Sequence, residues 1–183
     1  MKRILIYILA LFPVLTLAQG QKNIVKECAP MKDNKIFYRD TVHVRDMDQE
    51  QIFAVLHKWA IKNYGKDYFI SNLNANKSKG IINVSSKIEL LLNKTDKTTM
   101  KYKMNIFCHD NSYAVEISDI VYLYDPLDEK KFKTYPAEDV IANNGKSNTV
   151  ALIKDPKLFC DATRYYVDNL FAELLNMINI SQP

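Results

Sequence analysis

The order of hydrophobic and polar positions along the chain predicts strands interrupted by amphipathic helices. Over residues 36–44 apolar side chains fall largely on even positions and polar ones on odd positions, which is typical of a half-buried strand. Asp46 and Asp48 follow, each with a Gln three positions later, a spacing that indicates a helix capping box. Apolar residues then repeat every 3.6 positions over 52–64, and Gly65 is expected to end this first helix.

Four more strands are predicted from period-two alternation, over residues 68–73, 82–90, 100–108 and 113–123. The turn residues Asp110 and Asn111 join the last two, and the alternation loses its phase around Asp119, which indicates a bulge. Residues 125–154 are predicted to be irregular, with a short helical turn at 137–142. Asp155 and Pro156 then open a long second helix that runs to about residue 178.

This order predicts an α+β fold, β-α-β-β-β-β-α. Strands joined by short turns pair antiparallel, so we expect a five-stranded antiparallel sheet. Two amphipathic helices would cover one face, and the other face would meet solvent.

Several segments carry a family resemblance. They are the opening strand at 37–44, Trp59 near the end of the first helix, Lys79-Gly80-Ile81-Ile82, Asp110-Asn111-Ser112-Tyr113 and Ser118-Asp119-Ile120. Over roughly residues 35–178 the chain resembles domain of unknown function 4468, exported proteins of Bacteroidota with a TATA-binding-protein-like (TBP-like) fold. Asn111 stands where members often have Gly. The resemblance implies a fold and an envelope location, and it implies no activity and no catalytic residues.

Residues 1–18 have the pattern of a cleavable signal peptide. Lys2 and Arg3 precede an apolar run over 4–15, and Thr16-Leu17-Ala18 offers a cleavage site before Gln19. The run is shorter than the roughly 20 residues of a membrane-spanning helix, although an uncleaved anchor is the alternative. Gln19 does not suit a lipoprotein, which needs Cys there. We therefore expect export to the periplasm or outside, a flexible tether over 19–34, and a single domain over 35–180 without stable membrane insertion.

Charge and composition narrow the classes of partner. The chain has 25 Lys and Arg against 21 Asp and Glu, a net charge of +4, which falls to +2 once Lys2 and Arg3 are removed. Such mild basicity does not indicate a nucleic-acid partner. With four Gly residues, a phosphate-cradling loop is not expected, and we expect no cofactor.

The three cysteines leave at least one thiol unpaired. Their spacing matches no metal motif. Cys108 and Cys160 both lie on apolar stripes, so we favour small core residues over a disulfide between them. Cys28 lies in the predicted tether and is expected to be free.

No catalytic or metal-binding arrangement is indicated. His43, His57 and His109 have no helical metal-binding spacing, and solvated or capping roles account for them and for the acidic pairs. Two other functions stay open: an envelope hydrolase or carbohydrate-acting enzyme with a cleft near 125–154, and a small-ligand carrier with an interior lined by Met100, Tyr102, Met104 and Tyr166.

The open sheet face is the candidate site. Tyr, Phe and Arg are enriched at interfaces, although an ordinary solvated face is the simpler interpretation. The expected recognition residues are Arg39, Lys87, Lys101, Lys103, Phe107, Tyr122 and Tyr124. The resulting hypothesis is a non-enzymatic binding or accessory domain of the cell envelope with an envelope or extracellular protein partner. The sequence does not indicate an oligomeric state.

Overall fold

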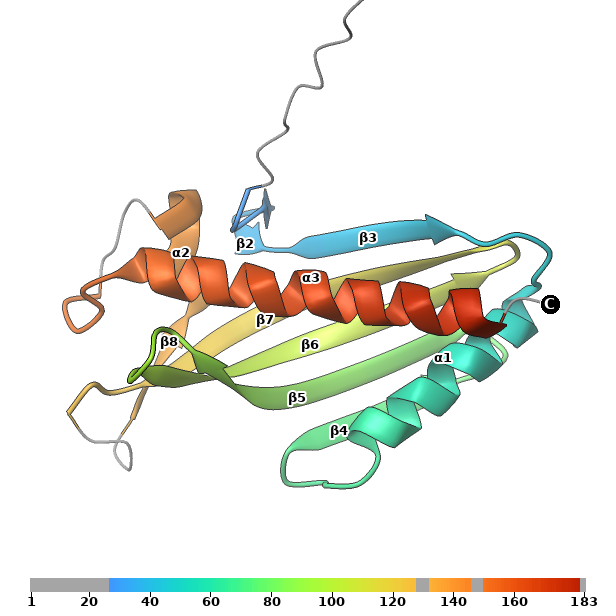
Figure 1. Ribbon diagram of the computed structural model, residues 1–183, viewed down its shortest axis with the longest axis horizontal. Helices are drawn as coiled ribbons and strands as arrows, with labels where there is room; N and C mark the ends of the chain where they lie inside the picture. Colours follow the sequence, from blue (N-terminus) through green and yellow to red (C-terminus); the bar gives the residue numbers. More distant parts are fainter. Residues whose placement is uncertain (1–26, 128–131, 146–149, 182–183) are drawn as a thin grey trace, which may run out of the picture.

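The computed structural model describes residues 27–127, 132–145 and 150–181. Its centre is an antiparallel sheet in the order β3-β7-β6-β5-β4 (Figure 1). These strands are β3 (Tyr38–His43), β7 (Ser112–Tyr124), β6 (Lys97–His109), β5 (Ile81–Leu91) and β4 (Ser71–Asn76). The predicted α+β fold and its five-stranded path are confirmed. A sixth strand, β8 (Lys133–Pro136), pairs with the end of β7 and was not predicted in the segment expected to be irregular.

Two helices, α1 (Gln49–Tyr64) and α3 (Pro156–Ser181), cover the same face of the sheet (Figure 1). The predicted capping box begins α1, because the Asp48 carboxylate accepts from the Gln51 N–H at 2.8 Å. Trp59 of α1 donates its indole N–H to Glu173 of α3 at 2.9 Å. This bond joins the two helices above the sheet.

The sheet has one buried face and one open face, as its alternation predicts. Side chains that point toward the helices are fully buried, among them Ile82, Met104, Ile106 and Ile117. The side chains between them along the strands, such as Asn83 and Lys103, are exposed. The open face is therefore polar and free of any covering helix among the described residues.

A bulge at Asp119 changes which residues of β7 are buried. Asp119 has a φ of +51°, and the register between β6 and β7 shifts between Lys101 and Lys103. One extra residue reverses the side-chain phase of the rest of the strand. Tyr122 and Tyr124 therefore face the helices and are buried, so their expected position on the open face is wrong.

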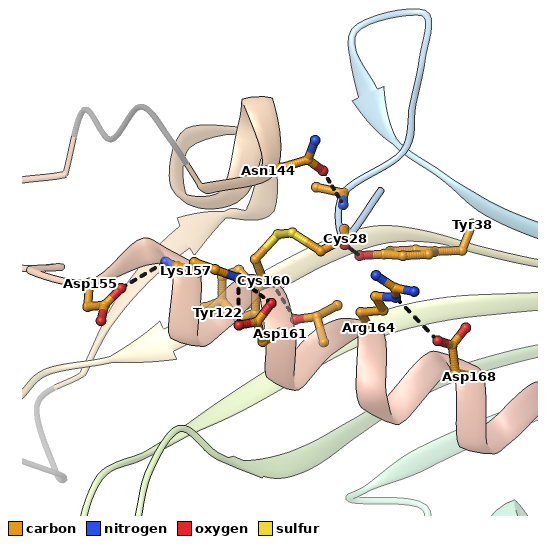
Figure 2. The surroundings of a disulfide bond; sticks show 12 residues. Cys28, Tyr38, Tyr122, Asn144, Asp155, Lys157, Cys160, Asp161, Arg164 and Asp168 are labelled. Carbon is orange, nitrogen blue, oxygen red and sulfur yellow. Dashed lines mark hydrogen bonds and ion pairs between the residues drawn. A yellow bond between two sulfur atoms is a disulfide. The ribbon is translucent and has the colours of Figure 1, made fainter. Parts of the chain in front are cut away.

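The N-terminal part of the described chain is folded. Residues 31–36 form a hairpin of β1 (Met31–Lys32) and β2 (Lys35–Ile36). Before it, Cys28 forms a disulfide with Cys160 at the start of α3, across 132 residues (Figure 2). The flexible tether expected over 19–34 is therefore wrong for residues 27–34, and residues 1–26 lie outside the described part of the chain.

The disulfide also corrects the expected state of the cysteines. Cys28 is bonded rather than free, and Cys160 is its partner rather than an unpaired core residue or the partner of Cys108. Cys108 is a free, fully buried thiol, as expected for a small core residue. Asn144 of α2 (Ala137–Gly145) accepts the Ala29 N–H at 3.0 Å, which adds a second attachment of this segment. The helical turn predicted at 137–142 lies within α2.

The loop before β4 differs from the prediction. β4 begins at Ser71 rather than at residue 68, so Tyr68 and Phe69 belong to the loop after α1, where both side chains are exposed.

Among the described residues, none of the helices combines the length and apolar character needed to cross a membrane.

Candidate functional site

An open cavity of about 400 Å³ lies on the uncovered face of the sheet. It extends over β5, β6 and the bulge of β7, and the loop before β4 borders it. We call it the lysine cavity and define it by six of its lining residues: Phe69, Ile70, Lys87, Lys101, Lys103 and Asp119.

Two of its lysines face each other across neighbouring strands. Lys87 of β5 is directly opposite Lys101 of β6, and both side chains are exposed. Neither forms an ion pair with another described residue. Like charges directly opposite each other destabilise a strand pair, so this arrangement costs stability.

The third lysine is neutralised by the bulge. Lys103 Nζ lies 2.8 Å from an Asp119 carboxylate oxygen, and this hydrogen bond raises the pKa of Lys103. The bulge therefore provides the acidic group of the cavity. With three ammonium groups and one carboxylate, the lining carries a formal charge of +2.

The apolar border of the cavity is held in place by a turn. Phe69 is 91 % exposed, yet its N–H donates to the Asp67 carboxylate at 2.8 Å. The Asp67 carbonyl accepts the Ser71 N–H at 2.8 Å, and the Ile70 carbonyl accepts the Lys87 N–H at 3.2 Å. Backbone bonds thus place Phe69 and Ile70 beside the lysines with their apolar surface open to solvent.

The structure brings together part of the predicted recognition set. Lys87, Lys101 and Lys103 line one cavity, whereas Arg39 and Phe107 lie on the same face outside its lining. Arg39 pairs with Glu116 at 3.2 Å, toward the β3 edge. Phe107 is half-buried on β6, which lies between β5 and β7. The other two predicted residues, Tyr122 and Tyr124, lie in the core under α3.

Phe69, Ile70 and Asp119 were not among the predicted site residues. The run Tyr68-Phe69-Ile70 has the composition of a short buried strand, which concealed its exposure. Asp67 just before it is a turn-forming residue and was the signal available. For Asp119 the sequence indicated the bulge but not which side chains face solvent beyond it.

The residues of the carrier hypothesis pack as core. Met100 and Met104 are fully buried between the sheet and the helices. The Tyr102 hydroxyl hydrogen-bonds to those of Tyr64 at 3.2 Å and Tyr166 at 2.5 Å. Burial is the main cause that raises the pKa values of Tyr64 and Tyr166, so these two phenols stay protonated within the hydrogen-bonded cluster.

A second cavity of about 450 Å³ lies where the loop after β7 meets the start of α3. Its two carboxylates already have structural partners: Asp96 accepts from the Tyr124 hydroxyl at 2.9 Å, and Asp155 accepts the Lys157 N–H at 3.1 Å. Among the described residues no group of three or more His, Cys, Asp or Glu is placed to hold a metal ion.

Comparison with known proteins places this chain and its fold in a family. Residues 38–123 match the family model described as "Domain of unknown function (DUF4468) with TBP-like fold". A TBP-like protein from Parabacteroides distasonis, solved by crystallography, is 61% identical, with a TM-score of 0.82 over 84% of this chain and 98% of that chain. A search of curated proteins finds no match.

A second crystal structure shows the fold at low identity. The DUF4468 family protein from Bacteroides ovatus is 17% identical, with a TM-score of 0.67 over 82% of this chain and 90% of that chain. The antiparallel sheet, the two covering helices and the long match to the Parabacteroides distasonis protein lead to one conclusion: this chain belongs to the DUF4468 family of domains of unknown function with a TBP-like fold.

Proposed function

We propose that the mature chain is an exported, non-enzymatic binding domain of the cell envelope that recognises its ligand through the open face of the sheet. The observation that carries the proposal is the lysine cavity. Lys87 and Lys101 are directly opposed without an ion-pair partner among the described residues, and Phe69 is held exposed beside them. The opposed charges cost stability, and a bound anion would relieve that repulsion, while an apolar ligand group would cover Phe69.

The lining groups suit binding. Ammonium groups supply positive charge, Phe69 and Ile70 supply apolar contact, and the carboxylate of Asp119 is engaged by Lys103. Sites that combine apolar lining with a few placed polar groups are typical of ligand recognition.

The disulfide supports the exported part of the proposal. Disulfides form and persist in oxidising compartments such as the periplasm and the extracellular space. Cys28 and Cys160 would find such an environment after the signal peptide directs the chain out of the cytoplasm.

Site-specific cross-linking in cells tests the proposal. A photoreactive residue replaces Ser85, which lines the cavity, and Lys62, an exposed residue of α1, is the matched control position. We expect the full chain to reach the envelope fraction and to form adducts from position 85 but not from position 62. Retention in the cytoplasm, or equal adducts from both positions, would contradict the proposal.

A second variant ties the adducts to the lysines. Adding Lys87→Glu and Lys101→Glu to the position-85 chain should remove its adducts, because both unpaired charges are reversed. Although Tyr122 was among the expected recognition residues, a Tyr122→Ala change would not test this surface, because Tyr122 lies in the core. Adducts that persist in this variant would show that the lysine cavity is not the recognition site.

A further inference from the structure

We infer that the lysine cavity binds a small amphipathic carboxylate, with its carboxylate between Lys87 and Lys101 and its apolar body against Phe69 and Ile70. The inference rests on the proposed function, since it names the ligand class of the same site.

The headgroup follows from the charges. Lys87 and Lys101 repel each other across the strand pair, and an anion between them converts that repulsion into two attractions. The two oxygens of a carboxylate can each accept a charge-assisted hydrogen bond from one ammonium group. Asp119 in the same lining neutralises Lys103 and would repel further negative charge. A ligand with one anionic group therefore fits better than a polyanion.

The apolar part follows from the border of the cavity. Phe69 is 91 % exposed and Ile70 is 46 % exposed, and Val121 of β7 also lines the cavity. The Asp67 turn holds the backbone of Phe69 and Ile70 in position, so the backbone needs little ordering when a ligand arrives. Covering this surface removes apolar area from water, which favours a ligand with a hydrocarbon or aromatic body.

The residue types favour a small molecule over a protein segment. Protein interfaces are enriched in Arg and depleted in Lys, whereas this cavity presents lysines. Arg39, on the same face, is paired with Glu116 at 3.2 Å and lies outside the lining. The volume of about 400 Å³ also falls in the range of roughly 300–1,000 Å³ that is common for small-molecule sites.

Calorimetric titration of the purified mature chain, with its disulfide intact, tests the ligand class. The probes are octanoate, octanol, acetate and octyl phosphate, with octanoate and octyl phosphate below their micelle concentrations and octanol below its solubility limit. We expect octanoate to bind at least about tenfold more tightly than octanol, which lacks the charge, and acetate, which lacks the apolar body. Octyl phosphate should bind no more tightly than octanoate.

Three variants locate the binding. Lys101→Met removes one ammonium group and keeps an unbranched apolar side chain, and it should weaken octanoate at least about tenfold. Lys62→Met makes the same change on α1 and should leave binding unaltered. Phe69→Ser should weaken octanoate and octanol alike. Thermal unfolding of each variant verifies that it is folded.

Several results would overturn the inference. They are the absence of octanoate binding, equal binding in the Lys101→Met and Lys62→Met variants, octanol as tight as octanoate, or octyl phosphate tighter than octanoate. If position 85 then still cross-links a protein, the open face recognises a macromolecule, and the proposed function stands without this ligand class. If position 85 forms no specific adduct either, both fail.

Discussion

The hydroxyl of Tyr122 on β7 lies 2.6 Å from the hydroxyl of Thr163 on α3, and both side chains are fully buried. Phe159, one turn earlier on α3, packs edge-on against the same tyrosine, with the two ring centroids 5.1 Å apart. This contact anchors the long helix to the sheet.

Substitutions at Tyr122 should therefore measure core stability. Tyr122→Ala should lower the free energy of unfolding by about 3–5 kcal/mol, as for other large aromatic residues truncated in a core. Tyr122→Phe should cost about 1–3 kcal/mol, because the Thr163 hydroxyl loses its partner. Urea denaturation measures both, with Tyr165→Phe at an exposed position of α3 as control. A Tyr122→Ala variant as stable as the control would contradict the buried position.

The Cys28–Cys160 disulfide should stabilise the fold by limiting the unfolded chain. Cys28→Ala should lower the free energy of unfolding by about 2–4 kcal/mol under oxidising conditions. Reductant should have a similar effect on the unaltered chain and little effect on the variant. Thiol titration in denaturant should find one free thiol before reduction and three afterwards; three before reduction would rule out the bond.

Cys108 should be unreactive in the folded protein. Burial raises the pKa of its thiol to about 12, and the thiolate is the reactive form. Alkylation under native conditions near neutral pH should therefore be slow and should accelerate in denaturant. Rapid native alkylation detected by mass spectrometry would contradict the burial of Cys108.

The bulge depends on backbone that Asp119 can adopt. At a φ of +51° Asp and Asn are tolerated, whereas a β-branched residue is strained. Asp119→Asn and Asp119→Val both lose the ion pair with Lys103. The difference between their free energies of unfolding therefore measures the cost of the left-handed backbone at this position. We expect the Val variant to be about 1–3 kcal/mol less stable than the Asn variant in urea denaturation. Equal stabilities would argue against a left-handed conformation at this position.

Alkaline pH should destabilise the protein. Burial raises the pKa values of Tyr38, Tyr64, Tyr113, Tyr122 and Tyr166 above the ordinary value of 10. Above about pH 10 the unfolded chain releases phenolic protons that the folded chain keeps, so the free energy of unfolding falls as pH rises. These groups contribute their full stability below pH 10 and lose it progressively as pH rises toward their folded pKa values.

The measurement is urea denaturation at about pH 8 and about pH 11. Tyr166→Phe should lower the sensitivity to alkali because it removes one buried phenol, and Tyr165→Phe, at an exposed position, serves as control. If the Tyr166→Phe variant lost as much stability as the unaltered chain between these pH values, the burial argument would fail.

Reversing one charge in the lysine cavity should separate stability from binding. Lys101→Glu places a carboxylate opposite Lys87 and should stabilise the chain slightly, by less than about 1 kcal/mol. The same variant should lose octanoate binding, because the carboxylates of the ligand and of the new side chain repel each other. Denaturation and calorimetry on the same sample measure both effects.

The sequence alone was sufficient for the five-stranded path and the two covering helices, because these elements depend on local patterns. The capping box at Asp48, the alternation through Met104 and Ile106, and Asp155 and Pro156 before the long helix each report on nearby backbone. Short turns then require antiparallel neighbours, and the single apolar face of the sheet requires the helices on that side. The exposed positions of Lys87, Lys101 and Lys103 follow from the same alternation.

Tertiary structure decided the features that depend on distant parts of the chain or on a single-residue shift. Because of one extra residue at Asp119, Tyr122 and Tyr124 lie in the core and not on the open face. The alternation of apolar and polar residues before such a bulge does not predict which side chains are buried after it. Cys28 pairs with Cys160 rather than Cys108 because the fold places residue 28 beside the start of α3, with the two Cα atoms 5.6 Å apart, and spacing in sequence does not encode this proximity. The cavity itself arises only where the Asp67 turn, two strands and the bulge meet, so its shape belongs to the folded chain.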